Sequence, residues 1–213
     1  MMRQARLGEL SSMVLVILAG LLLVGDSRPV AATPRLIMDE SVADDLRVVA
    51  NETWSRFLGM FQARTGCFGD VRLRAASDLS SRAAYDPATA TATIRVPATA
   101  VMLQGALIHE WAHHIEFQCR AHRDLKPAFL AAQGLPADTP WRTDHGLANT
   151  LESEWAGIPS EQYAEAIIEL VLGRRQIPTT ARVSSEAVGV IADWASGRAG
   201  SFGFKNNSSR QNE

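Results

Sequence analysis

The sequence has little lysine, tyrosine or cysteine, and it carries no surplus of positive charge. Lysine stands only at Lys126 and Lys205, and 21 basic residues face 23 acidic ones, for a formal net charge of -2 over 213 residues. Binding to the phosphate backbone of nucleic acid needs a basic surplus, so the composition argues against a nucleic-acid partner. Hydrophobic residues make up 46% of the chain, which is the balance of a globular protein.

Long hydrophobic runs are scarce as well. The apolar run at residues 13–24 follows two arginines and is shorter than the roughly 20 residues that span a bilayer. A short apolar run between basic and small residues is typical of a signal peptide. We therefore expect residues 1–32 to be a signal peptide cleaved after Ala32. The alternative is an uncleaved anchor, which would be the chain's contact with the membrane. In both cases the protein is expected to be secreted or associated with the cell envelope.

Only two cysteines occur, Cys67 and Cys119, and they lack the CxxC spacing of cysteine zinc sites. Two cysteines in an oxidising compartment favour a disulfide. We expect Cys67 and Cys119 to pair. The bond would close a loop of about 50 residues, which is worth about 4 kcal/mol in the chain-entropy model.

Hydrophobic periodicity predicts one α+β domain over residues 33–196, followed by a polar, disordered tail at residues 197–213. Helices are expected at about residues 41–64, 99–118, 127–133, 159–172 and 185–194. Trp54, Phe57 and Phe61 share the apolar face of the first helix. Alternating residues at 71–74 and 91–96 predict a small antiparallel sheet of about three strands packed on the helices. In its last strand Ala92, Ile94 and Val96 should face the helices, whereas Thr91, Thr93 and Arg95 should face outward.

The helix predicted at residues 99–118 contains the run His-Glu-Trp-Ala-His at positions 109–113. His109 and His113 are four residues apart, so they project from one face of the helix and can bind one zinc ion. Glu110 lies beside the metal, where a carboxylate can take a proton from water and pass it to a leaving amine. The surrounding residues are apolar, and burying these polar groups without a partner would be costly. The run is therefore a candidate catalytic metal site.

Catalytic zinc sites have a third protein ligand. The metzincin pattern needs a glycine and a further histidine after His113, but those positions hold Glu116 and Cys119. His114 points about 100° away from His113 around the helix. We interpret His114 as a residue that faces solvent or supports a ligand from outside the metal site.

The helix predicted at residues 159–172 begins with Glu161 and Glu165, which are four residues apart. Two carboxylates at this spacing share one helix face. One of them could ligate zinc while the other hydrogen-bonds a ligand imidazole. Both could instead be surface acids near a helix N-terminus, but the need of the two histidines for a third ligand favours the metal interpretation.

These two segments, at residues 109–113 and 161–166, resemble those of the gluzincins, which are zinc peptidases with two histidines and a downstream glutamate. The second segment is similar to a stretch in the catalytic domain of anthrax lethal factor and related minimal gluzincins. The resemblance covers about residues 83–172. It implies a zincin-like core in which a small sheet, its edge strand and the two motif helices surround the metal. It also implies His109, His113 and Glu161 as zinc ligands, Glu110 as general base, and Glu165 as a partner of a ligand imidazole.

One feature departs from the family pattern. Lethal factor-like enzymes carry a tyrosine shortly before the third ligand, and no tyrosine precedes Glu161 nearby. Tyr163 is expected to be packed rather than catalytic. His145 is a candidate donor to the oxyanion of the transition state.

Three functions are compatible with these observations. The first is an exported zinc metallopeptidase that holds a peptide or protein substrate by strand addition along residues 91–96. The second is a zinc-stabilised extracytoplasmic binding module or pseudo-peptidase. Its closed site would take a fourth ligand from Asp144, His145 or Glu154. The third is a helical domain without metal.

Overall fold

The computed structural model describes residues 32–142 and 152–198. The chain divides into two units, Met1–Ala31 and Ala32–Glu213. The expected signal peptide before Ala32, the candidate ligands Asp144 and His145, and residues 199–213 of the expected tail lie outside the described residues. Within the described ranges, no helix is long and apolar enough to cross a membrane.

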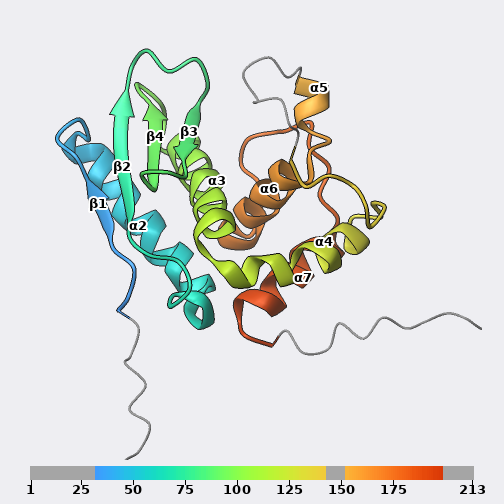
Figure 1. The fold of residues 1–213 in the computed structure, drawn as a ribbon. Helices are drawn as coiled ribbons and strands as arrows, with labels where there is room; N and C mark the ends of the chain where they lie inside the picture. The colour runs from blue at the N-terminus through green and yellow to red at the C-terminus, as the bar shows by residue number, and fades with distance from the viewer. Residues whose placement is uncertain (1–31, 143–151, 199–213) are drawn as a thin grey trace, which may run out of the picture. The chain divides into compact units, whose positions relative to one another are not determined.

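One mixed β-sheet packs against the helices (Figure 1). Its strands are β1 (Leu36–Met38), β2 (Val71–Ala76), β3 (Ala83–Asp86) and β4 (Thr91–Arg95), in the order β1-β2-β4-β3. The β1–β2 and β2–β4 pairs are parallel, and the β3–β4 pair is antiparallel. The expected α+β class is confirmed, but the antiparallel sheet of three strands is wrong in strand number and in direction. A helix joins β1 to β2, and such a crossover connects parallel neighbours.

Strand β4 lies inside the sheet, with β2 on one side and β3 on the other. The expectation that residues 91–96 form an edge for strand addition is therefore wrong, and the edge on this side is β3. Ala92 and Ile94 are buried and Arg95 is exposed, as expected. Thr91 is buried rather than outward-facing, and its hydroxyl accepts a hydrogen bond from the Thr89 hydroxyl at 2.9 Å.

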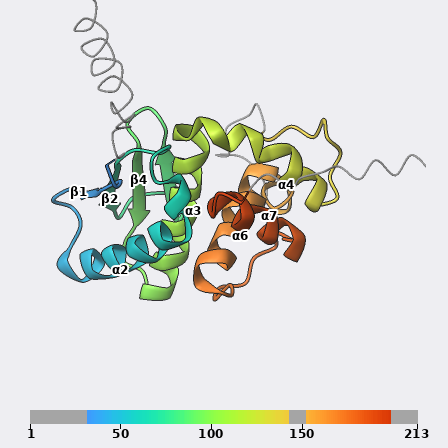
Figure 2. The same ribbon diagram turned by 90° about the horizontal axis from the view of Figure 1, so that it is seen from below.

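Six α-helices complete the described fold (Figures 1 and 2). They are α2 (Asp44–Met60), α3 (Ala100–Gln118), α4 (Lys126–Ala132), α5 (Glu152–Trp155), α6 (Pro159–Leu172) and α7 (Ser185–Ala195). Local signals explain several bounds. The Thr99 side chain accepts from the backbone of Met102 and begins α3. Pro159 occupies the first turn of α6, and Gly173 ends that helix with a φ of 73°. Both α5 and β1 are too short to have been expected from periodicity.

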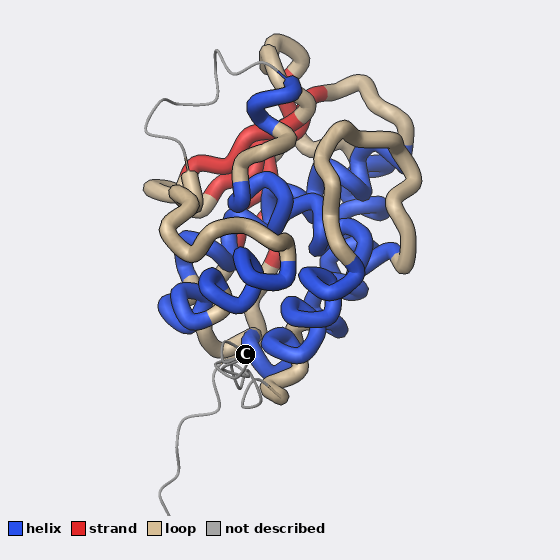
Figure 3. The backbone as a smooth tube through the Cα atoms, turned by 90° about the vertical axis from the view of Figure 1, so that its right-hand side faces the viewer, coloured by secondary structure: helices blue, strands red, loops and turns tan. Residues whose placement is uncertain are grey.

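Helix α3 contacts α2, α6, β3 and β4, and Figure 3 shows the strands gathered on one side of the helices. The core beside α3 is aromatic. Trp111 is fully buried with its ring 4.9 Å from that of Trp54 and 5.6 Å from that of Phe57. Trp54, Phe57 and Phe61 are all buried, so their expected place in the core is confirmed. This packing holds one face of α3 firmly and leaves its histidine face toward α6.

The expected disulfide is present. Cys67 and Cys119 are bonded, with their Cα atoms 4.7 Å apart, and they are 52 positions apart in sequence. Cys119 directly follows α3. The bond therefore ties the C-terminal end of the motif helix to the connection between α2 and β2.

Candidate metal centre

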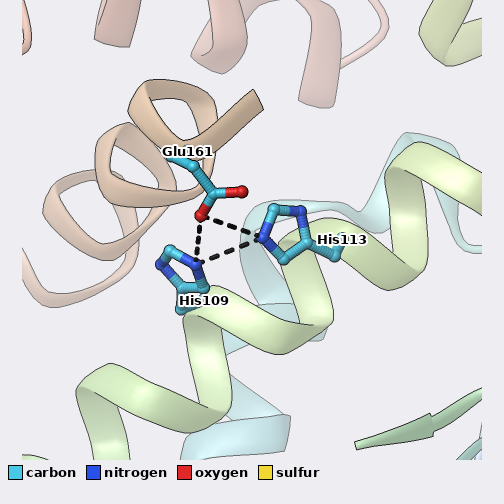
Figure 4. Close-up of side chains that lie close together, drawn as sticks. All are labelled: His109, His113 and Glu161. Carbon is cyan, nitrogen blue, oxygen red and sulfur yellow. Dashed lines mark hydrogen bonds and ion pairs between the residues drawn. The ribbon is translucent and has the colours of Figure 1, made fainter. Parts of the chain in front are cut away.

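Two helices bring three candidate ligands together (Figure 4). His109 and His113 project from one face of α3, and Glu161 reaches them from the first turn of α6. The Nε2 atom of His109 lies 3.0 Å from Glu161 Oε2 and 3.2 Å from His113 Nε2. The third side of this triangle, from His113 Nε2 to Glu161 Oε2, measures 3.5 Å. Residues far apart in the sequence thus present three ligand atoms to one point.

The three atoms fit a metal ion. Ligands that each lie about 2.0–2.1 Å from a tetrahedral zinc ion are about 3.3–3.4 Å from one another, and the observed separations of 3.0, 3.2 and 3.5 Å match this. Each imidazole also has its Nδ1 atom near another carboxylate. A neutral ring that donates its Nδ1–H to this carboxylate has its Nε2 lone pair facing inward. Nδ1 of His113 also lies 2.9 Å from Arg142 Nη2. Lone pairs converging on one point repel unless a cation lies between them.

Burial shapes the electrostatics of the site. Burial alone would raise the pKa of Glu161, but the adjacent imidazoles of His109 and His113 outweigh it and hold that pKa well below its usual range. Burial alone would lower the pKa of His109, but Glu161 and Glu110 raise it. The charged carboxylate is thus strongly favoured, as a metal ligand requires.

Glu110 lies beside these ligands without belonging to the triangle. Its side chain is 6% exposed and lines the same cleft as His109 and His113. Burial raises the pKa of the Glu110 carboxyl, and the two imidazoles offset this only in part. A carboxyl at this position, beside the three ligand atoms, can accept and release a proton.

Two further glutamates hold the histidines from outside. Glu165 Oε1 lies 3.1 Å from His109 Nδ1, and the other carboxylate oxygen pairs with Arg175. Glu165 therefore contacts the ring nitrogen of His109 that faces away from the triangle. Glu116 Oε2 lies 3.2 Å from His113 Nδ1, a contact that the sequence reasoning missed. The spacing of three residues between His113 and Glu116 on one helix was the available signal.

His114 does not take part in the metal site. It is fully buried, with Nε2 2.9 Å from the Gly69 carbonyl and Nδ1 2.8 Å from the Tyr85 hydroxyl. The solvent-facing interpretation of His114 is wrong, because the ring packs between the helix and the loop before β2. Its contacts support the fold on the sheet side of α3.

Neither tyrosine offers a free hydroxyl to the site. Tyr163 is fully buried, with its ring 4.6 Å from that of His122, so its expected packing role is confirmed. The Tyr85 hydroxyl is shared by His114 and Gln118. Trp155 instead covers the site, stacking on the His109 ring at 5.9 Å with 21° between the planes. Glu154, a fourth-ligand candidate, is not part of the three-residue cluster.

A cleft of about 840 Å³ opens beside the three ligands. Its walls include β3, the outward face of α3 and the segment at residues 175–179. Apolar side chains contribute much of the lining, among them Met102, Ile168 and Leu172. The candidate metal site is therefore reachable from a cleft with apolar walls, which is also lined by β3, the outer strand of the described sheet.

The chain matches no protein-family model, no curated protein and no solved structure. The likeness to gluzincins is thus carried by the two motifs alone. The described residues show a buried set, His109, His113 and Glu161, that could hold a metal ion.

Proposed function

We propose that the protein is an exported zinc metallopeptidase of the gluzincin type. The observation that carries this proposal is the triangle of His109, His113 and Glu161 atoms, with sides of 3.0 to 3.5 Å, open to a cleft. Two imidazoles and one carboxylate are a ligand set of catalytic zinc, which keeps one position for water or substrate. The disulfide supports export, because such bonds persist in oxidising compartments.

The chain's own residues divide the work. A bound zinc ion would supply a Lewis acid for the substrate carbonyl and make a water molecule more acidic. Glu110 takes the proton from that water and delivers it to the leaving amine. Glu165 accepts the Nδ1–H of His109 and so keeps the Nε2 lone pair directed at the ligand triangle. Trp155 covers the His109 ring and excludes water from that side.

The cleft favours an extended peptide as substrate. No strand of the described residues pairs with the outer edge of β3, and Ala83, Ala84 and Tyr85 of this strand line the cleft. A peptide can add to such an edge through main-chain hydrogen bonds. Along α3 the lining reaches from Val101 to Phe117, which is about 24 Å at 1.5 Å per residue. That length accommodates roughly seven extended residues, and the apolar walls favour apolar side chains.

The test combines metal analysis with a proteolysis assay. We expect about one zinc per purified chain, and cleavage of an unfolded protein substrate such as casein. Glu110→Gln should keep the zinc and lose cleavage, whereas His109→Ala should lose both. Glu52→Gln, at an exposed position on α2, is the matched control and should behave as wild type. Zinc without any cleavage by the wild-type chain would favour the binding module, and an absence of metal would contradict both functions.

A further inference from the structure

Glu116 is a buried carboxylate that joins three parts of the metal centre. Its side chain is 3% exposed. It accepts hydrogen bonds from Trp141 Nε1 at 2.8 Å, from Arg142 Nε at 2.7 Å and from Arg142 Nη2 at 2.5 Å. His113 Nδ1 lies 3.2 Å from Glu116 Oε2 and 2.9 Å from Arg142 Nη2. A buried carboxylate is costly unless it is paired and fully hydrogen-bonded. Of these partners, His113 is itself a candidate metal ligand, and Trp141 and Arg142 belong to the segment beside it.

The contacts continue from Glu116 to the third ligand. The carbonyl of Trp141 accepts a hydrogen bond from the backbone of Ser160 at 3.0 Å. Ser160 is fully buried and directly precedes Glu161 in the first turn of α6. The segment held by Glu116 thus seats the turn that carries Glu161.

The two histidines have matching support. His109 contacts Glu165, which pairs with Arg175, and Glu165 comes from α6. His113 contacts Glu116, which pairs with Arg142, and Glu116 comes from α3 itself. Each imidazole therefore has a buried glutamate at Nδ1, and each glutamate has an arginine that balances its charge.

We propose that Glu116 is a positioning residue of the metal centre, a role that rests on the proposed metal site. It accepts the Nδ1–H of His113, so the Nε2 lone pair of that ring points at the metal. It also holds residues 141–142 against α6, which sets Glu161 in reach of both histidines. Carboxylates in this position orient ligand imidazoles and raise their basicity.

The deciding variant is Glu116→Gln in the full chain. Glutamine has nearly the same shape, but its amide N–H would face either the Nδ1–H of His113 or the donors of Trp141 and Arg142. The first clash is relieved when the imidazole moves its proton to Nε2, which is the nitrogen that must bind metal. We expect zinc affinity, measured by chelator competition, to fall about 10- to 100-fold. NMR of the zinc-free variant should show His113 protonated at Nε2.

Three controls separate positioning from a general loss of structure. Glu165→Gln should lose affinity to a similar extent, because it removes the same support from His109. Trp141→Phe removes one donor but leaves the Glu116–His113 contact, so its affinity should stay within about threefold of wild type, since a single neutral hydrogen bond is worth only about 1 kcal/mol. Glu52→Gln should not change affinity. Unaltered zinc binding by Glu116→Gln, with His113 still protonated at Nδ1, would overturn the proposal.

The zinc-free wild-type chain gives a test that needs no variant. Its His113 should be protonated at Nδ1, and a ring protonated only at Nε2 would overturn the proposal even if Glu116→Gln failed to fold. Failure of the proposed function gives a different result. A wild-type chain that binds no zinc or cleaves no peptide contradicts that function, whereas the His113 tautomer of the zinc-free chain tests the role of Glu116 by itself.

Discussion

His109 and Glu161 face each other between α3 and α6, with Nε2 of the imidazole 3.0 Å from Oε2 of the carboxylate. The two residues are 52 positions apart in the sequence, so only helix packing brings them together. Trp111 anchors one face of α3 in the aromatic core, and the opposite face then presents the histidines to α6. The packing of α3 against α6 therefore places two of the candidate metal ligands together.

Replacing Glu161 tests the third ligand directly. Glu161→Ala removes one of three protein ligands, and we expect zinc affinity to fall by more than about 100-fold, since even partners of ligands cost 10–100-fold when lost. Isothermal titration or chelator competition measures the change. Glu169→Ala is the matched control, because Glu169 lies two turns further along the same helix and contributes nothing to the cluster. Unchanged affinity in Glu161→Ala would show that another residue is the third ligand.

His122 predicts a pH dependence of stability that does not involve the metal. It is fully buried among aromatic rings, and neither ring nitrogen has a hydrogen-bond partner among the described residues. Burial lowers the pKa of His122 to about 3 from 6.5. The unfolded chain therefore takes up a proton at this residue below pH 6.5 while the folded chain does not. Because of this residue, the free energy of unfolding has its full value above pH 6.5 and falls progressively as the pH drops toward 3.

The measurement compares wild type with His122→Leu. Between pH 6.5 and pH 5 the wild-type free energy of unfolding should fall by about 2 kcal/mol through this residue. His122→Leu should lack that share of the decline and should be at least as stable at pH 5, because leucine brings no unpaired nitrogen. Urea unfolding of the metal-free proteins at pH 6.5 and at pH 5 gives the change in the free energy of unfolding for each protein. An equal change in wild type and His122→Leu would contradict a neutral, buried His122.

Val101 tests the proposed substrate groove. Its side chain is 40% exposed and lines the cleft near the start of α3. Val101→Ser should lower kcat/KM for a peptide with apolar side chains about fivefold, which corresponds to about 1 kcal/mol of lost apolar contact. Val48→Ser is the control, because Val48 is 58% exposed on α2 and away from the cleft lining. An equal loss in both variants would place substrate elsewhere on the surface.

Helices and local spacings were accessible from the sequence, since they depend on neighbouring residues. Helix periodicity located α6 at residues 159–172, and the four-residue spacing placed His109 and His113 on one face of α3 before any tertiary contact was known. The cysteine count and the expected compartment led to the Cys67–Cys119 bond that the structure contains. These inferences rest on helix geometry and on covalent chemistry, which need no knowledge of the wider fold.

Only the tertiary structure decided the rest, because those features depend on long-range packing. Strand direction follows from the path of the connections, and so β4 became an inner strand while β3 became the edge beside the cleft. The role of Glu116 depends on its pairing with Arg142, which lies 26 positions away in the sequence. His122 carries no local sign that aromatic rings surround it. The sequence determined which residues can bind a metal, and the packing of α6 on α3 decided that Glu161 joins them, because helix–helix contact sets distances that local spacing does not encode.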